Sequence, residues 1–475
     1  MVQGNCAAKG NSKGNHGGGS RRPSSHRSRK CNLNRNGNDG RKTQQPGSKQ
    51  GQDAIKEEGD EEEQENYEPF PRLEKKHQQI ILNIFRDTFS DVLFSDTFTS
   101  TLQAVKQALY EREFAKAFGD PEYLAVYATR WSPTRALCYS SILGGIRKHL
   151  DGVIVEEEAE TETTPSGKTT TEEPKTTKED NTPAEEEDPL ASQTTNLSLS
   201  EPPSQKTTST VIPKLNILSI GGGPAELVAL GSFLNQQTPL SSPSLSGSIT
   251  LLDSAPYAPL LTRLETSLTA TPPISKYASA AAKAANVPLL SPASRISSKF
   301  IQRDALELGK EGFTSVLESQ KDVPILATLL FTLNELFTSS GIGATTKFLL
   351  DLTASLPLNS LLLVVDSPGS YSETAVGKDA SKKYPMAWLL DRVLLAADPK
   401  TGKATAVVDG RKWRKLETRK SSWFRLAEGR GGEPGLDYPI GLENMRYQLH
   451  LYRLVDEDEP EEEEEEKGSE ESDEE

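Results

Sequence analysis

Cysteine and histidine are scarce in this 475-residue chain, which holds only three cysteines and five histidines. Cys6 and Cys31 stand in a polar N-terminal segment, and Cys138 lies far from both. They provide neither a disulfide framework nor the spacing of zinc ligands, and the scattered histidines suggest no metal cluster. We therefore expect no bound metal and a reducing, intracellular compartment.

Long apolar runs are missing as well. No run of eighteen apolar residues occurs, and the N-terminus lacks the apolar segment of a secretory signal, so we expect no membrane span. Only 34% of the residues are hydrophobic, and the formal net charge is −15. These values indicate a globular enzyme diluted by disordered polar segments.

The charge is distributed unevenly along the chain. Residues 1–50 are basic, whereas 51–68, 156–188 and 456–475 are strongly acidic, so the remaining part is mildly basic. This balance suits an anionic partner such as RNA, although it is also ordinary for a soluble enzyme. We predict a disordered basic-then-acidic tail at 1–66, a helical N-terminal part at 67–155, an acidic Thr/Pro/Ser linker at 156–210, the main domain at 211–455 and an acidic disordered tail at 456–475.

The stretch that organises the main domain is residues 215–227. Six largely apolar residues run into Gly221, Gly222 and Gly223, and a helical pattern follows. This order predicts a buried strand, a tight turn and the start of a helix. Glycines allow a ligand to approach the backbone, and the helix start offers free N–H groups. A glycine turn without a ligand is the alternative.

Further apolar runs predict the other strands of a sheet. They cover residues 249–253, 300–305, 325–331, 361–366 and, in alternating form, 447–454. Asp253 ends the second strand, and Asp304 and Ala305 end the third, at the edge where ligands of such sheets bind. An acid after the second strand can accept hydrogen bonds from ribose hydroxyls. The sequence therefore predicts a Rossmann-like, doubly wound α/β sheet with an N-terminal helical block and disordered charged tails.

The order of the glycine turn, Asp253, Asp304 and the Asn334-Glu335 pair resembles class I S-adenosylmethionine-dependent methyltransferases. A closer resemblance, to the fungal family of large-subunit (25S) rRNA uridine-N3 methyltransferases, is carried by residues 130–136, 219–224, 331–337, 364–373 and 384–390. Ser219 departs from the general pattern, because many class I enzymes carry an acid two residues before the first glycine of this motif.

The resemblance implies a cofactor and a partner. The cofactor is S-adenosyl-L-methionine (SAM), bound by residues 211–455, and the partner is large-subunit rRNA or a pre-ribosomal particle. The predicted SAM contacts are Gly221, Gly222, Gly223, Asp253, Asp304 and Ala305.

Three polar residues stand where such methyltransferases place the target atom. Asn334 and Glu335 follow one apolar run, and Asp366 ends the next, before a Ser-Pro-Gly turn. We predict that these catalytic candidates orient the uracil or assist the loss of its N3 proton. The alternative is that the same residue types only cap loops.

Two stretches combine aromatic and basic residues and predict RNA contacts. Arg130, Trp131 and Arg135 could clamp a base or the RNA backbone, although a helix-packing corner at Ser132-Pro133 is an alternative. The second stretch extends from Arg411 to Arg430, and its alternative is a solvated basic loop with inward-packed rings. Its predicted contacts are Arg411, Lys412, Trp413, Arg414, Lys415, Trp423 and Arg425.

Two classes of function therefore compete. The first is a monomeric, nuclear or nucleolar rRNA methyltransferase of ribosome biogenesis, in which the basic residues 21–30 act as an import signal or RNA-binding arm. The second is a noncatalytic ribosome-assembly factor that retains the fold. A Rossmann oxidoreductase is a more distant alternative, because no G-x-G-x-x-G follows the first strand of the sheet.

Overall fold

The computed structural model describes residues 69–158, 211–237, 244–369, 373–376, 382–396, 405–429 and 435–460. These residues belong to one unit, Asn66–Glu475. The predicted tail at 1–66 and most of the predicted linker and acidic tail lie outside them, so the disorder predicted there stays a prediction.

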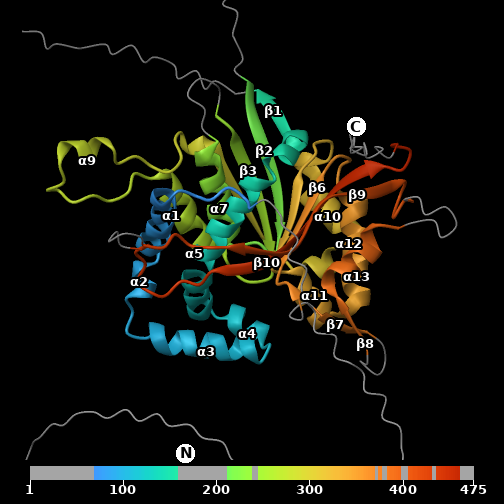
Figure 1. The fold of residues 1–475 in the computed structure, drawn as a ribbon, viewed down its shortest axis with the longest axis horizontal. Coiled ribbons are helices and arrows are strands. Elements are labelled where there is room, and N and C mark those ends of the chain that lie inside the picture. Colours follow the sequence, from blue (N-terminus) through green and yellow to red (C-terminus); the bar gives the residue numbers. More distant parts are fainter. Residues whose placement is uncertain are drawn as a thin grey trace, which may run out of the picture. The chain divides into compact units, whose positions relative to one another are not determined.

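The central sheet has the strand order β4-β3-β2-β5-β6-β10-β9, and β1 pairs with β2 (Figure 1). Its strands are β1 (Ile154–Glu158), β2 (Val211–Ile220), β3 (Ser246–Asp253), β4 (Ile296–Gln302), β5 (Leu326–Leu330), β6 (Leu361–Asp366), β9 (Arg411–Phe424) and β10 (Met445–Asp456). Strands β2 to β6 run parallel, whereas β10 and β9 are antiparallel additions. The prediction of a doubly wound α/β sheet is confirmed.

Helices cover both faces of this sheet. They are α1 (Lys75–Thr88), α2 (Ser90–Leu93), α3 (Phe98–Tyr110), α4 (Phe114–Gly119), α5 (Pro121–Gly145), α6 (Arg147–Leu150), α7 (Pro224–Gln236), α8 (Ala258–Thr269), α9 (Ala280–Ala284), α10 (Ala305–Val316), α11 (Leu333–Ser339), α12 (Gly341–Ser355) and α13 (Met386–Leu394). A small hairpin of β7 (Glu373–Val376) and β8 (Lys382–Pro385) precedes α13.

Alternate residues of β2 pack into two separate hydrophobic cores, one on each face of the sheet. Leu215 and Ile217 of β2 pack with α1, α5, α7 and α8, whereas Leu218 and Ile220 pack with α10, α12 and α13. This two-residue period is the side-chain alternation of a strand that is buried on both faces. The N-terminal helices are therefore part of the layer that covers one face of the sheet.

The alternative of a helix-packing corner at Ser132-Pro133 is wrong, because α5 runs without interruption from Pro121 to Gly145. A proline inside a helix removes the N–H that would bond to the carbonyl four residues earlier. Here that carbonyl belongs to Thr129, and the Tyr438 hydroxyl donates a hydrogen bond to it at 2.9 Å. A distant side chain thus replaces the backbone donor that Pro133 lacks.

The structure also corrects the loop alternative for the basic stretch and one boundary of the predicted linker. Residues 411–424 form the strand β9, paired along its length with β10, and not a loop. In addition, β1 reaches Glu158, inside the predicted linker, and pairs antiparallel with the beginning of β2. Both strands carry many charged residues, which hide the apolar pattern that marks a strand.

Candidate functional site

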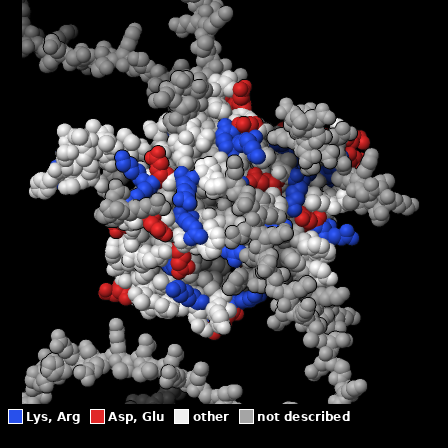
Figure 2. All heavy atoms as spheres, in the orientation of Figure 1, with Lys and Arg blue, Asp and Glu red and all other residues white. Residues whose placement is uncertain are grey.

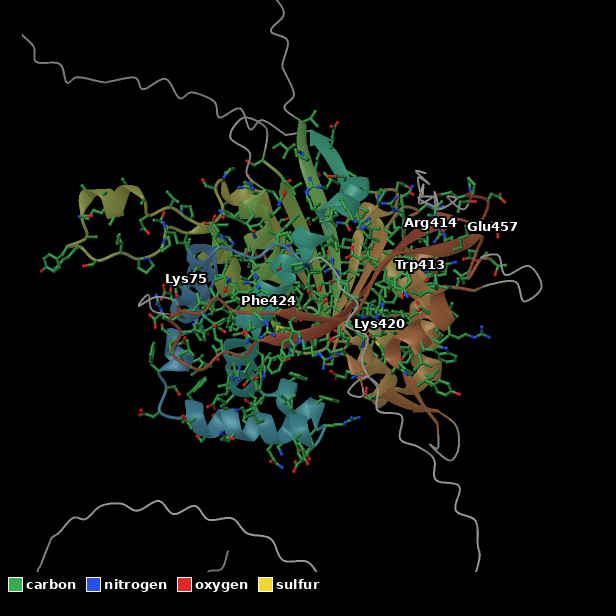
Figure 3. The ribbon with its side chains drawn as sticks, viewed as in Figure 1. Lys75, Trp413, Arg414, Lys420, Phe424 and Glu457 are labelled. Carbon is green, nitrogen blue, oxygen red and sulfur yellow. The ribbon has the colours of Figure 1, made fainter. Side chains whose placement is uncertain are left out.

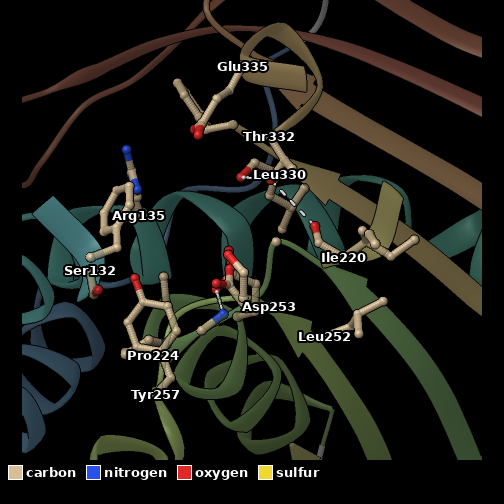
Figure 4. A pocket seen from close by; sticks show the side chains of 18 of the residues that line it. Ser132, Arg135, Ile220, Pro224, Leu252, Asp253, Tyr257, Leu330, Thr332 and Glu335 are labelled. Atoms are coloured by element: carbon tan, nitrogen blue, oxygen red, sulfur yellow. Dashed lines mark hydrogen bonds between the residues drawn. The ribbon is translucent and has the colours of Figure 1, made fainter. Parts of the chain in front are cut away.

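A cavity opens where the strand order reverses between β2 and β5, the position at which doubly wound sheets bind ligands (Figure 4). The loops that follow β2, β3, β4 and β5 form its floor, and α4 and α5 close one side. The lining residues are Phe118, Tyr127, Ser132, Arg135, Ile220, Gly221, Gly223, Pro224, Ala225, Glu226, Leu252, Asp253, Ser254, Tyr257, Arg303, Asp304, Ala305, Leu330, Phe331, Thr332, Glu335 and Leu336.

The glycine turn after β2 brings two of its three predicted residues to the cavity. Gly221 has φ +69°, and a Cβ atom there would lie 2.4 Å from the Thr332 hydroxyl oxygen, so only glycine fits. Gly223 also lines the cavity, whereas Gly222 does not. A Cβ on Gly222 would lie 2.4 Å from the Ser219 hydroxyl oxygen. Gly222 therefore serves the packing of the turn.

Glu226 supplies a carboxylate that the sequence prediction missed. It stands in the first turn of α7, is only 9% exposed, and accepts a hydrogen bond from the Gly223 N–H at 2.7 Å. Burial raises the pKa of this carboxyl. The signal in the sequence was a glutamate three residues after Gly223, the spacing with which an acid caps a helix start. Ser219, by contrast, is buried beneath the turn.

The predicted strand-end acids both line the cavity, and so does Ala305. Asp253 accepts a hydrogen bond from the Ala255 N–H at 2.7 Å, and burial raises its pKa to about 7. Asp304 is exposed and caps α10 through a 2.9 Å hydrogen bond from the Leu306 N–H. Burial thus favours the protonated form of Asp253.

Arg135 reaches the cavity from α5 and was predicted as an RNA contact. Its guanidinium donates a hydrogen bond to the Tyr127 hydroxyl and lies 5.4 Å from the centre of the Phe331 ring. Figure 4 shows Arg135 and Glu335 reaching toward the same part of the cavity from different helices. The structure therefore places a half-buried cation beside the predicted cofactor site.

The three predicted catalytic residues are not equivalent. Glu335 lines the cavity, and burial together with the Asp366 charge raises its pKa to about 7. Asp366 is only 3% exposed, and its two oxygens accept hydrogen bonds from the N–H groups of Asn334 at 2.9 Å and Ser367 at 2.8 Å. Neither Asp366 nor Asn334 lines the cavity. The Asp366 carboxylate thus holds the start of α11 through the hydrogen bond from the Asn334 N–H.

Arg130 and Trp131 line a second groove next to this cavity. The groove is bounded by α5, Phe331 and residues 443–446, and it shares Arg135 and Phe331 with the cavity. The Arg130 side chain is only 9% exposed and pairs with Glu443. The three predicted residues of α5 therefore lie together at the junction of the two hollows.

The basic residues at the start of β9 are engaged within the protein. Arg411 donates to the last carbonyls of α12, Lys412 to two carbonyls after β10, and Lys415 pairs with Asp391. Trp413 is 2% exposed, as in the inward-packed alternative, and Arg414 pairs with Glu459. These side chains bind carbonyls and carboxylates of the protein itself. Their role in RNA binding remains a prediction.

The end of β9 differs from its beginning. Trp423 is 53% exposed, and the guanidinium groups of Arg425 and Arg446 lie 5.1 and 6.0 Å from its ring centre. At 3.3 Å per residue, β9 separates Trp423 from Trp413 by roughly 30 Å. Figure 3 shows Trp413 and Arg414 near Glu457 at one end of β9 and Phe424 at the other. The predicted basic segment is therefore two separate surfaces.

Within the described ranges, no helix is long and apolar enough to cross a membrane. The same part of the chain holds no group of three or more His, Cys, Asp or Glu side chains that could bind a metal ion.

Comparison with known proteins gives the family. The family described as "Putative SAM-dependent methyltransferase" matches residues 85–453. A 25S rRNA (uridine(2843)-N(3))-methyltransferase of Saccharomyces cerevisiae is 26% identical over 398 residues, which cover 79% of this chain and 85% of the yeast protein. The family resemblance seen in the sequence is confirmed by these two matches.

Solved structures are more distant. An O-methyltransferase family protein of Burkholderia thailandensis is 11% identical over 52% of each chain, with a TM-score of 0.24. The 16S rRNA (adenine(1408)-N(1))-methyltransferase of Catenulisporales acidiphilia is 12% identical over 51% of this chain and 88% of its own, with a TM-score of 0.26. These scores are too low to bear on the site. By its match over most of its length, the chain belongs to the family of SAM-dependent methyltransferases.

Proposed function

We propose that this enzyme transfers the methyl group of SAM to N3 of a uridine in large-subunit rRNA. The observation that carries the proposal is the similarity over 79% of the chain to the yeast 25S rRNA (uridine-N3)-methyltransferase. The cavity at the carboxyl edge of the sheet supports it. So does the adjoining groove, because a methyl acceptor must enter beside the cofactor.

The cavity fits the chemical groups of SAM. Gly221 and Gly223 line the cavity, so a ligand bound there would lie against the backbone of the turn. The position of Asp253 in the cavity lining supports a role in accepting hydrogen bonds from the ribose hydroxyls, and Asp304 and Ala305, which follow the neighbouring strand, would then lie toward the adenine. SAM supplies a methyl group activated on a positively charged sulfur.

Arg135 and Glu226 fit the amino-acid end of SAM, which carries one carboxylate and one ammonium group. A guanidinium binds a carboxylate, and a carboxylate binds an ammonium group. The Glu226 carboxylate already occupies the N–H of Gly223 at the start of α7, where a dinucleotide enzyme would bind its phosphates. This arrangement favours SAM over a dinucleotide cofactor.

Glu335 fits the acceptor of the N3 proton. Methylation at N3 requires the N3–H bond to break as the new N–CH3 bond forms, and the proton must move to a base. Glu335 lines the cavity and has a pKa of about 7, so much of it is ionised at neutral pH and still basic enough to accept a proton. Asp366 holds α11 in position instead.

The test is mass spectrometry of nucleosides from a large-subunit rRNA transcript incubated with the full-length protein and SAM. The expected product is 3-methyluridine at one site. Tight binding of SAM and RNA with no methylated nucleoside, in a transcript or a pre-ribosomal particle, would contradict the proposal and favour the noncatalytic assembly factor. We also propose a nuclear or nucleolar location, which fluorescence microscopy of a tagged chain tests.

A further inference from the structure

The groove beside the cofactor cavity has the features of a base-binding site. It lies between α5 and residues 443–446, and Arg135 and Phe331 line both hollows. A substrate in this groove would therefore meet the cofactor cavity at the Arg135–Phe331 boundary. Reaction requires the acceptor atom to lie close to the methyl donor, which makes this boundary the place where the acceptor must arrive.

Thr134 gives the groove an unused polar group. Its side chain is only 5% exposed, and its hydroxyl oxygen is buried without a hydrogen-bond partner among the described residues. A hydroxyl can donate one hydrogen bond and accept others, and leaving it unpaired in the interior costs free energy. The groove therefore contains a buried hydroxyl that a bound ligand could satisfy.

Aromatic and cationic side chains complete the walls. Trp131 is half-buried, with the guanidinium of Arg130 5.6 Å from its ring centre. Arg446 lies across the groove and donates from Nε to the Ser421 hydroxyl at 2.8 Å. A flat ring can stack on Trp131, and guanidinium groups donate to carbonyl oxygens. A uracil has both features, a flat ring and two carbonyl oxygens.

The backbone at Phe331 is strained at the junction of the two hollows. Phe331 has φ +59°, a left-handed conformation that is costly for a bulky residue. Its N–H donates to the Val365 carbonyl at 2.7 Å, and its ring centre lies 6.4 Å from that of Tyr139. Strain of this kind clusters at functional sites. Here it places the ring between cofactor cavity and groove.

We propose that this groove, defined by Trp131, Thr134 and Arg446, receives the target uracil after it leaves the RNA stack; the inference rests on the proposed function. The ring lies on Trp131, its carbonyl oxygens meet Thr134 and Arg446, and N3 faces the Arg135–Phe331 boundary. Trp423 pairs with Arg446 across β9 and β10, so flanking RNA continues over the exposed Trp423 and Arg425.

Crosslinking locates the base directly. The probe is a large-subunit rRNA transcript containing 4-thiouridine, bound to the full-length protein with S-adenosylhomocysteine and irradiated. The expected crosslinked peptides contain Trp131–Thr134 or Met445–Arg446. In parallel, unsubstituted transcript and SAM report whether wild type forms 3-methyluridine.

Two conservative variants test the polar contacts. Thr134→Val removes only the hydroxyl and should lower RNA affinity or the single-turnover rate roughly threefold to tenfold, and Arg446→Gln should lower them roughly tenfold or more. Affinity for S-adenosylhomocysteine should not change in either. Thr129→Val, also buried in α5, and Arg453→Gln, at the far end of β10, are the matched controls and should behave as wild type.

The outcomes separate the two proposals. Crosslinks confined to residues 411–425, or wild-type RNA affinity and rate in both groove variants, would overturn the groove. Groove crosslinks without any 3-methyluridine would overturn the proposed function but keep the groove as a base-binding site. Crosslinks in the groove with 3-methyluridine formed and both variants impaired are the expected result.

Discussion

At the scale of single residues, the buried carboxylates of the site differ in what their oxygens contact, and this difference separates their roles. Asp253, Glu335 and Asp366 all lose solvent, and burial raises their pKa values to about 7, 7 and 6. The two carboxylate oxygens of Asp366 accept hydrogen bonds from two backbone N–H groups, whereas Glu335 lines the cavity. Only a side chain that faces the cavity can exchange a proton with a substrate. Glu335 is therefore the better candidate for the base.

Glu335→Gln should lower the single-turnover methylation rate by roughly 10²-fold or more, with cofactor and RNA binding retained. In wild type the rate should rise with pH through about 7, because only the ionised carboxylate accepts a proton. Asp366→Asn should instead lower the stability by about 1–3 kcal/mol, since one backbone N–H loses its acceptor. A full-rate Glu335→Gln enzyme would exclude this residue as the base.

Glu335→Gln should also change the free energy of unfolding, by an amount that depends on pH. The folded-state pKa of Glu335 is about 7 against an ordinary 4.5, so the stabilising protonation is complete below pH 4.5 and is lost as the pH rises through 7. Glu335→Gln, neutral at every pH, should therefore be more stable than wild type by about 1–3 kcal/mol at pH 8 and no more stable near pH 4.5. Urea unfolding of the ligand-free proteins measures this; a pH-independent difference would contradict it.

Arg135 and Glu226 can be assigned to the ends of the cofactor by changing the ligand. S-adenosylhomocysteine has the amino-acid end, and 5′-methylthioadenosine lacks it. Arg135→Met and Glu226→Gln should each weaken the first ligand by roughly tenfold or more and leave the second nearly unchanged, because a charge-assisted hydrogen bond is lost only with the first. Calorimetry measures both. Equal losses for the two ligands would mean that the variants damage the cavity generally.

At the scale of elements, α5 depends on a contact from the far end of the chain. The missing N–H of Pro133 leaves the Thr129 carbonyl to the Tyr438 hydroxyl, and the same helix carries Trp131, Thr134 and Arg135 to the two hollows. A kink here would turn these side chains away from the site. The Tyr438 contact therefore links the stability of α5 to function.

A double-mutant cycle tests this contact. Tyr438→Phe should cost about 1–2 kcal/mol of unfolding free energy in the wild-type background, because a carbonyl inside the protein loses its donor. In Pro133→Ala the residue 133 N–H can bond to Thr129, so the same change should cost much less. Urea unfolding of the four proteins gives the coupling energy. Equal costs in both backgrounds would show that Tyr438 acts only by packing.

Strand β9 carries two basic clusters, one at each end, and we expect only the second to bind RNA. Lys412→Met should lower the stability, since its ammonium group binds the Glu457 and Glu459 carbonyls, and leave RNA affinity unchanged. Arg425→Gln should leave the stability unchanged and lower both RNA affinity and its salt dependence. Filter binding at two salt concentrations measures this. Loss of RNA affinity in Lys412→Met at unchanged stability would instead mean that the basic side chains at the start of β9 contact RNA.

The elements were predictable from the sequence where local pattern decides them. Apolar runs and glycines marked β2, β3, β5 and β6 and the turn at Gly221–Gly223, because buried parallel strands are continuously apolar. The uninterrupted α5 was not predictable, since the Tyr438 donor is distant in sequence. Strand β9 was missed because its polar side chains satisfy distant carbonyls and carboxylates. Arg135 was predicted as an RNA contact, and only the fold shows that it lines the cavity.

At the scale of the whole molecule, the N-terminal helices and the sheet form one unit. The Ser232 hydroxyl of α7 contacts His77 of α1 and Ser140 of α5, each at 2.7 Å. The cavity itself combines residues of α5 with the strand ends. Basic and acidic side chains of the described residues are interspersed on the face shown in Figure 2.

The register of β1 and β2 predicts how the chain can be shortened. Glu158 is the antiparallel partner of Val211, so the residues on either side of the segment 159–210 lie side by side, as at the turn of a hairpin. A two-residue Asn-Gly turn fits such a position because its backbone twist matches that of paired strands. Replacing residues 159–210 by Asn-Gly should therefore leave the sheet, and with it the cofactor cavity, intact.

The shortened enzyme should be more stable than wild type by about 1–3 kcal/mol, because closing a shorter loop costs less chain entropy. Its affinity for S-adenosylhomocysteine should be unchanged, since the cavity lining in the described part of the chain comes from residues outside the deleted segment. Urea unfolding and calorimetry measure the two effects, and a variant with a longer Gly-Ser loop controls for strain in the tight turn. If both variants lose stability or cofactor affinity, residues 159–210 contribute to the folded enzyme. If both keep cofactor affinity but methylate rRNA more slowly, the segment acts on the RNA instead.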